Sequence, residues 1–270
     1  MPVLSRLYLG TNTKMYKTIS MTQEYLRRLA ELTADLPRNE LELFVIPSFT
    51  SLYHARLCVP SELIRIGAQN MGWEEEGQFS GEISPFMLKE VGAEIVMIGH
   101  SERRHVFLET DEMENRRVLC ALRNGLTPLL CIGEDAEEKA FGLADEVLRT
   151  QLKIGLSGLT PGQASKIRVA YEPVWAIGVG GVPASAEYAE ARHASIRCCL
   201  CELFGEETGS RIPLLYGGSV NPQNAEELIR VENIDGLFIG RSAWQADRFD
   251  AIIRSVIPLW KEKQTRAGNG

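Results

Sequence analysis

The stretch EIVMIGHSERR, residues 94–104, joins a short apolar run to a charged segment. Apolar residues that are rich in β-branched types and bounded by glycine are typical of a strand buried on both faces. His100 follows Gly99 directly, and Ser101-Glu102 has the composition of a helix start. The stretch therefore predicts a strand, a polar side chain at its carboxyl end, and a short helix after it.

The same order of apolar run and amphipathic segment recurs along the whole chain. The runs are LYLGTN (7–12), LELFVIPS (41–48), IRIGAQN (64–70), EIVMIGH (94–100), TPLLCIGE (127–134), IRVAYEP (167–173), PLLYGGS (213–219) and DGLFIGRS (235–242). Segments with helical spacing lie between and after them, at 21–36, 111–125, 145–156, 188–205, 221–230 and 248–260. Eight such units predict parallel strands joined by right-handed crossovers and closed into a (β/α)8 barrel.

Smaller signals place the boundaries of these units. Gly205 is expected to end its helix, and Asn221 is expected to be the N-cap of the next one, with Pro222 at the first helical position. No linker interrupts the series. We therefore expect a single barrel domain over residues 1–260, followed by a loose C-terminal tail over 261–270.

Composition excludes several classes of partner. The 270 residues carry a net charge of −7, which argues against nucleic acid, because phosphate backbones require a basic face. The six cysteines form no CxxC pair, and neither a zinc site nor any other metal site is expected. The N-terminus has no long apolar stretch of the signal-peptide type, and no membrane-spanning run is present. These features favour a cytoplasmic protein.

The predicted barrel selects the positions at which function is expected. Active sites of this architecture lie at the carboxyl ends of the strands. The residues that end the eight runs are Asn12 and Lys14, Gln69 and Asn70, His100, Glu134, Glu172, the segment 216–219, and Gly240 with Arg241. This set is rich in groups that move protons and bind anions.

Three of these side chains suit proton transfer beside a carbonyl group. A carboxylate such as Glu172 can remove a proton from the adjacent carbon. His100 lies at a helix start, where the dipole disfavours the imidazolium, so the neutral ring can donate a hydrogen bond. Lys14 would offset the negative charge of an enediolate. Taken singly, each also has an ordinary explanation as a packed histidine, a loop carboxylate or a solvated lysine.

The loops at this end of the barrel add a lid and an anion site. Small and glycine-rich residues follow a stiff hinge, which predicts a lid that excludes water. The lid comprises Pro173, Val174, Trp175, Ala176, Ile177, Gly178, Val179 and Gly180. The loops YGGSV (216–220) and FIGRS (238–242) are expected to bind phosphate through backbone N–H groups. The alternative for the lid is an ordinary βα loop whose Trp packs on the surface, and the alternative for the other two loops is ordinary tight turns.

Together these residues resemble the triosephosphate isomerase family. The resemblance is carried by GAQNMGWEEEGQFSGEISPFMLKEVGAE (67–94), IGHSERR (98–104), CIGE (131–134), AYEPVWAIG (170–178) and YGGSVNP (216–222), and it covers roughly residues 5–258. It implies an aldose–ketose isomerase on a (β/α)8 TIM barrel. The substrate would be a small sugar phosphate, and no metal or organic cofactor would be needed, because the chemistry is proton transfer.

The resemblance also assigns individual roles. Glu172 would be the base that moves a proton between two carbons, and His100 the neutral electrophile, as is established for this enzyme family. Lys14 would be the electrostatic clamp, Asn12 a neighbour of the substrate oxygens, and Glu102 a supporting group. The residues implied to bind substrate or phosphate are Gly178, Ser219, Gly240 and Arg241.

Family members are dimers, so the resemblance also implies a homodimer. The loop EEGQFSG (75–81) would insert into the second protomer near the partner's Lys14. Ser80 would lie at the tip of this loop, and Gln69 is assigned to the same dimer contact.

The sequence departs from the family pattern around the site. Thr13 and Tyr16 replace the Trp and the second Asn of the usual Asn-Trp-Lys-Met-Asn, and Arg241 replaces the second glycine of the eighth loop. The lid ends in VGGV (179–182) in place of Thr-Gly-Lys-Thr. These changes spare Glu172 and His100, so they suggest retained chemistry with an altered substrate.

Two substrates are compatible with this pattern. Dihydroxyacetone phosphate and glyceraldehyde 3-phosphate, the glycolytic pair, are the family default. A four-carbon ketose phosphate such as L-erythrulose 1-phosphate, from the breakdown of polyols such as erythritol, is the alternative. A phosphate-binding barrel without catalysis is disfavoured, because Glu172, His100 and Lys14 are all present.

Overall fold

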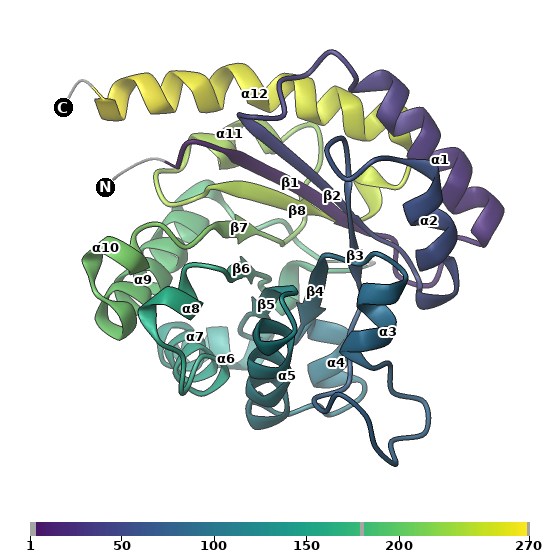
Figure 1. Cartoon of the computed structure of the whole chain (residues 1–270). Coiled ribbons are helices and arrows are strands. Elements are labelled where there is room, and N and C mark those ends of the chain that lie inside the picture. Colours follow the sequence, from purple (N-terminus) through teal and green to yellow (C-terminus); the bar gives the residue numbers. More distant parts are fainter. Residues whose placement is uncertain (1–3, 179–180, 269–270) are drawn as a thin grey trace.

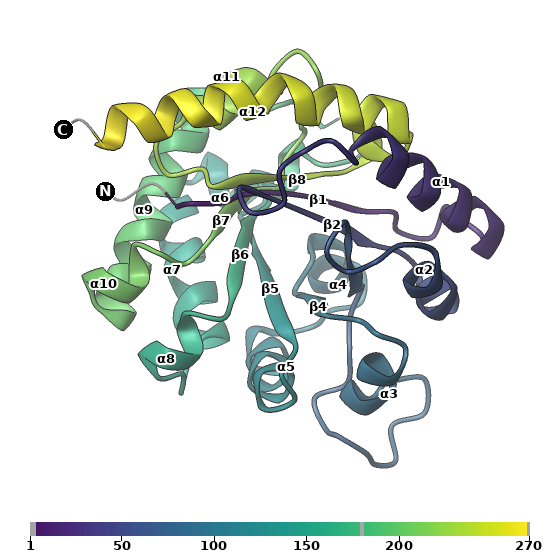
Figure 2. The same cartoon turned by 45° about the horizontal axis from the view of Figure 1, so that its top comes forward.

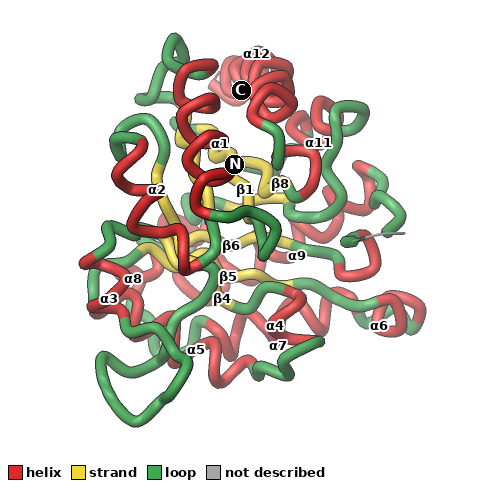
Figure 3. The backbone as a smooth tube through the Cα atoms, turned by 90° about the vertical axis from the view of Figure 1, so that its right-hand side faces the viewer, coloured by secondary structure: helices red, strands yellow, loops and turns green. Residues whose placement is uncertain are grey.

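The structure is a computed structural model that describes residues 4–178 and 181–268. Within these residues eight parallel strands close into a barrel in sequence order, and helices surround it (Figures 1 and 3). The strands are β1 (Leu7–Asn12), β2 (Leu41–Ile46), β3 (Arg65–Ala68), β4 (Ile95–Ile98), β5 (Thr127–Ile132), β6 (Arg168–Tyr171), β7 (Leu214–Tyr216) and β8 (Gly236–Ile239). Each of the eight runs contains one strand, so the predicted barrel is confirmed.

The helices follow the strands as expected. They are α1 (Ile19–Leu32), α2 (Leu52–Cys58), α3 (Pro85–Glu90), α4 (Ser101–His105), α5 (Asp111–Arg123), α6 (Ala136–Ala140), α7 (Ala144–Gly155), α8 (Pro161–Ala164), α9 (Ala186–Phe204), α10 (Glu206–Gly209), α11 (Ala225–Arg230) and α12 (Ala246–Gly268). Single 3-10 turns lie at Phe49–Ser51, Val174–Ala176 and Arg241–Ala243. α9 ends at Gly205, whose φ of 80° confirms the predicted stop.

The barrel closes because β1 pairs with strands on both of its sides. Leu9 is in register with Leu43 of β2 and with Leu237 of β8. The first and last βα units of the chain are therefore neighbours, and their loops meet at the same part of the barrel mouth (Figure 2). This closure brings Asn12 and Lys14 next to the loop that carries Arg241.

Large side chains fill the inside of the barrel and form its floor. Phe44 of β2 and Phe238 of β8 stack across the interior with ring centroids 5.8 Å apart. Gly10 makes room for them, because a Cβ at this position would lie 2.1 Å from the ring of Phe44. The interior is therefore a packed core, and the site is confined to its mouth.

Charged residues close the opposite end of the barrel. Arg168 of β6 and Arg65 of β3 both bind the carboxylate of Glu42, at 2.5 Å and 3.3 Å. The guanidinium of Arg168 also lies 4.9 Å from the ring centroid of Tyr8. Each buried charge thus has a partner, which is the condition for a stable ionic cluster in a barrel.

Two expectations about helix boundaries differ from the structure. Residues 261–268 of the expected tail continue α12; Lys263 donates to the carbonyls of Val231 and Ile234, and Gln264 donates to the carbonyl of Leu4. These contacts tie residues past 260 to the barrel. The second error concerns the helix start after β7.

Asn221 is not the N-cap of a helix that begins at Pro222. The helix α11 begins at Ala225, and its N-cap is Asn224. The side chain of Asn221 instead accepts a hydrogen bond from the backbone N–H of Gln223 at 2.9 Å. Asn221 therefore caps a separate turn that precedes α11, and this turn forms part of the loop that follows β7.

One loop stands away from the barrel. The segment between β3 and α3 projects outward beside α3 (Figure 1), and Ser80 and Phe79 within it are exposed. Trp73 packs against Phe79 with ring centroids 5.7 Å apart, which gives the loop a small core of its own.

Of the helices in the described part of the chain, none is both long and apolar enough for a membrane span.

Candidate active site

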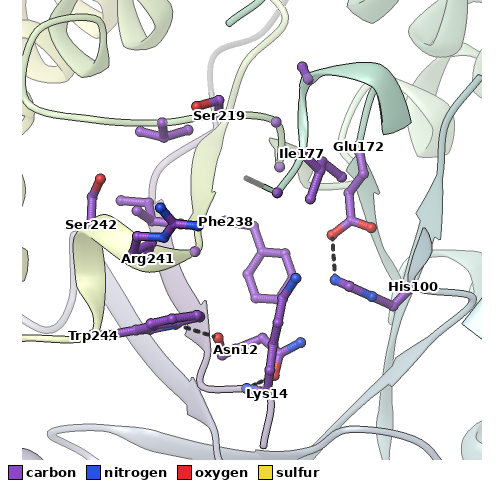
Figure 4. Close-up of a pocket in the computed structure, with 17 residues that line it drawn as sticks. Asn12, Lys14, His100, Glu172, Ile177, Ser219, Phe238, Arg241, Ser242 and Trp244 are labelled. Carbon is purple, nitrogen blue, oxygen red and sulfur yellow. Dashed lines mark hydrogen bonds and ion pairs between the residues drawn. The ribbon is translucent and has the colours of Figure 1, made fainter. Parts of the chain in front are cut away.

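A cavity of about 270 Å³ opens at the carboxyl ends of the strands. It is lined by Asn12, Lys14, His100, Glu172, Ala176, Ile177, Gly178, Gly217, Gly218, Ser219, Val220, Phe238, Ile239, Gly240, Arg241, Ser242 and Trp244. These residues come from the carboxyl ends of β1 and β8 and from the loops after β1, β4, β6, β7 and β8. Figure 4 shows that their side chains converge on one space.

Glu172 follows β6 and points into this cavity. Only 3% of the residue is exposed, and its Oε2 accepts a hydrogen bond from the backbone N–H of Ser101 at 3.3 Å. Gly217 leaves the space for its stem, because a Cβ there would lie 2.8 Å from Cγ of Glu172. Burial raises the pKa of the Cys131 thiol well above its usual value, and the Glu172 carboxylate raises it further. The neighbour of the carboxylate is thus an uncharged thiol.

His100 is oriented by the helix that it caps. Its Nδ1 accepts a hydrogen bond from the backbone N–H of Glu102 at 3.2 Å, so this nitrogen carries no proton. The neutral ring must then hold its hydrogen on Nε2. That nitrogen lies 3.7 Å from Oε1 of Glu172. The backbone N–H of Glu102 thus sets both the tautomer of His100 and the direction of its donor, and Figure 4 shows the other ring nitrogen facing Glu172.

Lys14 and Asn12 form a connected group at the end of β1. Lys14 has a φ of 51°, a left-handed conformation that is unusual for a residue with a side chain. It is held there by its own N–H, which donates to Oδ1 of Asn12 at 2.7 Å. Gln69 donates to the same oxygen at 3.1 Å and to the carbonyl of Lys14 at 2.7 Å. The ammonium of Lys14 lies 2.6 Å from Glu102.

The loops after β7 and β8 form the other side of the cavity. Ser219 and Gly240 lie there, and Figure 4 shows Ser219 across the cavity from His100. A Cβ on Gly240 would meet nothing within 4 Å, so its backbone faces open space. The loop after β7 is fixed from outside by Asn224, which donates to the carbonyl of Ser219 at 2.8 Å. This side has exposed backbone and no acidic side chain among the described lining residues.

The segment that was expected to be the first hinge of a lid is anchored on Glu134. This carboxylate is fully buried, and its Oε1 accepts hydrogen bonds from Tyr171 at 3.0 Å, Trp175 at 2.8 Å and Tyr188 at 2.9 Å. The ammonium of Lys139 lies 3.2 Å from the ring centroid of Trp175. Burial and the Glu134 carboxylate raise the pKa of both tyrosines, so both remain hydroxyl donors.

The predicted site residues are distributed as follows. Those that line the cavity are Asn12, Lys14, His100, Glu172, Ala176, Ile177, Gly178, Ser219, Gly240 and Arg241. Pro173, Val174 and Trp175 lie in the hinge outside the lining, whereas Val179 and Gly180 lie outside the described residues. Glu102 reaches the site through Lys14, and Gln69 through Asn12. Ser80 lies in the projecting loop, away from the cavity lining.

Two aromatic residues of the cavity lining were not predicted from the sequence. Phe238 belongs to β8 and reaches the cavity as an inward-facing strand residue, a position that the alternation of side chains along a strand indicates. Trp244 lies four residues beyond Ile239-Gly240 and enters from the turn that follows β8. Its inward direction depends on a hydrogen bond from its indole to the carbonyl of Asn12 at 2.9 Å, which no local pattern predicts.

The barrel and its mouth define the class of the protein. A buried carboxylate beside a neutral imidazole donor, with a lysine nearby, is equipped to move a proton between adjacent carbons of a carbonyl compound, which is aldose–ketose isomerase chemistry. A family model described as triosephosphate isomerase matches residues 7–256. The chain belongs to the triosephosphate isomerase family and is an isomerase of that type.

Individual relatives carry two different names. The chain is 48% identical to an L-erythrulose-1-phosphate isomerase of Rhizobium etli, over 93% of this chain and 92% of the relative. It is 42% identical to a triosephosphate isomerase of Dictyoglomus thermophilum, over 93% of this chain and all of the relative. The crystal structure of triosephosphate isomerase from Bartonella henselae matches with a TM-score of 0.83 and 36% identity, covering 93% and 98% of the two chains.

Proposed function

We propose that the protein interconverts L-erythrulose 1-phosphate and its isomer with the ketone moved one carbon away from the phosphate. The observation that carries the reaction type is the 3.7 Å separation of His100 Nε2 and Glu172 Oε1 at the cavity wall. The choice of substrate is supported by the 48% identity to the Rhizobium etli enzyme and by the changed residues around the cavity.

The four-carbon substrate requires no new chemistry. L-Erythrulose 1-phosphate is dihydroxyacetone phosphate with a hydroxymethyl group in place of one hydrogen on the carbon that the base deprotonates. Glu172 removes the remaining proton there, and His100 donates a hydrogen bond to the oxygen that becomes negative. The hydroxyl proton on the deprotonated carbon then passes by way of His100 to the former carbonyl oxygen, and Glu172 returns its proton to the former carbonyl carbon. The product is again a ketose, because the new carbonyl carbon carries the hydroxymethyl group.

The remaining assignments follow from this reaction. Lys14 stabilises the enediolate, Asn12 contacts the substrate oxygens, and Glu102 holds the Lys14 ammonium in the absence of substrate. Gly178, Ser219 and Gly240 offer N–H groups to the phosphate. A homodimer formed through the loop around Ser80, a cytoplasmic location and a place in polyol breakdown are parts of the same proposal.

Dihydroxyacetone phosphate is the second candidate substrate. The 42% identity to the Dictyoglomus thermophilum triosephosphate isomerase supports it, as does the presence of the whole proton-transfer set. In this case the enzyme would serve glycolysis, and the changes at Tyr16 and Arg241 would be tolerated variation.

The decisive experiment compares kcat/KM on the two substrates under one set of conditions. The proposal expects a preference for L-erythrulose 1-phosphate, with Glu172→Gln as the control for contaminating host isomerase. A clear preference for dihydroxyacetone phosphate would replace the proposed substrate with the second one. No turnover of either compound would contradict the isomerase assignment itself.

A further inference from the structure

Arg241 is a cation in the cavity wall that has no acidic partner. In the described part of the chain, Lys14 and Arg241 are the Lys and Arg side chains that line the cavity. The ammonium of Lys14 lies 2.6 Å from Glu102, whereas no hydrogen bond or ion pair joins the exposed side chain of Arg241 to another described residue. A guanidinium in this state can bind a phosphate through two parallel hydrogen bonds without first breaking an ion pair.

The position of Arg241 in the cavity indicates which part of the substrate it contacts. Figure 4 shows its guanidinium entering from the turn after β8, on the side of Ser219 and Ser242, while Glu172 and His100 face the cavity from the opposite side. The reacting carbons must lie beside Glu172 and His100. If the phosphate on the next carbon points to the side of the cavity with exposed backbone, it extends toward Arg241, and the far hydroxymethyl group extends away from it.

The turn that carries Arg241 is fixed by three contacts from other elements. The hydroxyl of Tyr25 donates to the carbonyl of Ala243 at 2.7 Å. The indole of Trp244 donates to the carbonyl of Asn12 at 2.9 Å. The ring of Trp244 also packs against Tyr16, with centroids 4.5 Å apart. Arg241 is thus presented from a turn that is held in place before substrate arrives.

We propose that Arg241 binds the substrate phosphate through its guanidinium, and that Trp244, with Tyr16 behind it, is the positioning residue for the turn. This proposal rests on the sugar-phosphate site proposed above and holds for a three-carbon or a four-carbon substrate. It also links two departures from the family pattern, Tyr16 and Arg241, in one structural unit. The phosphate site of this chain then combines backbone N–H groups with a side-chain cation.

Inorganic phosphate is the probe, because its binding can be measured by calorimetry without turnover. Arg241→Gln should weaken phosphate binding by about tenfold or more, as expected for the loss of a charge-assisted hydrogen bond. KM should rise by a similar factor on either substrate, with kcat little changed. Arg241→Lys should retain part of the affinity. The loss should also shrink as salt concentration rises.

Arg248→Gln is the matched control. Arg248 lies exposed on α12, outside the cavity lining, and its replacement removes the same charge from the same region. Phosphate affinity should stay unchanged in this variant. An equal loss in both variants would overturn the proposal in favour of a general charge effect. Unchanged phosphate affinity in Arg241→Gln, with an altered ratio of kcat/KM between the two substrates, would place Arg241 at the sugar end and overturn it as well.

The positioning role of Trp244 has its own test. Trp244→Phe removes the hydrogen bond to Asn12 and keeps an aromatic ring against Tyr16. It should weaken phosphate binding less than Arg241→Gln does, and it should add nothing when the two changes are combined, because Trp244 acts through Arg241. Additive effects in the double variant would contradict this role. Failure of these tests would leave the preference between substrates, and hence the proposed function, untouched.

Discussion

Nε2 of His100 and Oε1 of Glu172 lie 3.7 Å apart, with 5% and 3% of the two side chains exposed. This distance is too long for a good hydrogen bond, so neither group satisfies the other. A substrate oxygen beside Nε2 would accept the hydrogen bond of His100, and a substrate carbon beside Oε1 would supply the proton that Glu172 accepts. The two groups therefore face the site of reaction and do not form a closed pair.

Replacing the base should abolish turnover and spare binding. Glu172→Gln keeps the shape of the side chain and removes the proton acceptor, so kcat should fall by roughly 10²–10⁴. Calorimetry with inorganic phosphate should give the same affinity as the unchanged protein, because the phosphate side lies opposite. A variant that retains most of its turnover would contradict the assigned base.

The tautomer of His100 can be observed directly. Because Nδ1 accepts from the N–H of Glu102, nitrogen NMR at pH 7 should show a neutral ring with hydrogen on Nε2. His100→Asn cannot place a donor at the same point, and kcat should fall by about 10²–10³, as for the loss of a donor to an oxyanion. A ring protonated on Nδ1 would refute the proposed direction of hydrogen bonding.

Gly217 should be required for the position of Glu172. A Cβ at Gly217 would lie 2.8 Å from Cγ of Glu172, so Gly217→Ala should displace the carboxylate. Misplacement by about 1 Å can cost about 10²-fold in kcat, with KM changed less. Gly162→Ala is the control, since a Cβ there meets nothing within 4 Å. Equal activity in both variants would show that Glu172 tolerates the shift.

The Lys139–Trp175 contact should stabilise the hinge of the lid. Lys139→Met keeps the stem and removes the charge that lies 3.2 Å from the Trp175 ring centroid. Loss of a cation–π contact of about 0.5–2 kcal/mol should loosen the hinge. We expect faster amide exchange over residues 174–177 and a several-fold fall in kcat/KM. Exchange as slow as in the unchanged protein would rule out this role.

Because of Lys263, the free energy of unfolding should rise as the solution becomes more alkaline. Burial lowers the pKa of its ammonium from 10.5 to about 8, against the opposing effect of Asp235. Between these two values the unfolded chain holds the proton that the folded protein has lost. The free energy of unfolding should therefore increase with pH from about 8 to about 10.5, by about 3 kcal/mol at most, at about 1.4 kcal/mol per pKa unit.

Variants isolate this contribution from other groups that titrate in the same range. Urea titrations at several pH values should show that Lys263→Met loses the rise, whereas Lys166→Met, at an exposed lysine, retains it. If the pH dependence of Lys263→Met ran parallel to that of the unchanged protein, the rise would have another source.

The sequence predicted the repeating parts of this molecule and missed the contacts between distant ones. Apolar runs and strand ends suffice to place Glu172 and His100 at the barrel mouth, because the register of a βα unit follows from its own residues. Trp244 reaches the cavity through a bond to Asn12, and the last turns of α12 are ordered by bonds from Lys263 to the segment before β8. Partners so far apart leave no local pattern.

Local chemistry also misled in one place. Asn221-Pro222 has the composition of a helix start, but the helix begins at Ala225, because Asn224 is the N-cap and Asn221 caps a turn of its own. The side chain of Asn224 makes no capping bond to α11; it accepts from the N–H of Asn221 and donates to the carbonyl of Ser219, so these contacts hold the loop after β7.

The bond between Trp244 and Asn12 spans 232 positions of the chain. During synthesis Asn12 is therefore made 232 residues before Trp244, which completes its side of the cavity. A chain that ended before β8 would contain Glu172 and His100 but would lack Arg241, Ser242 and Trp244 of the cavity lining.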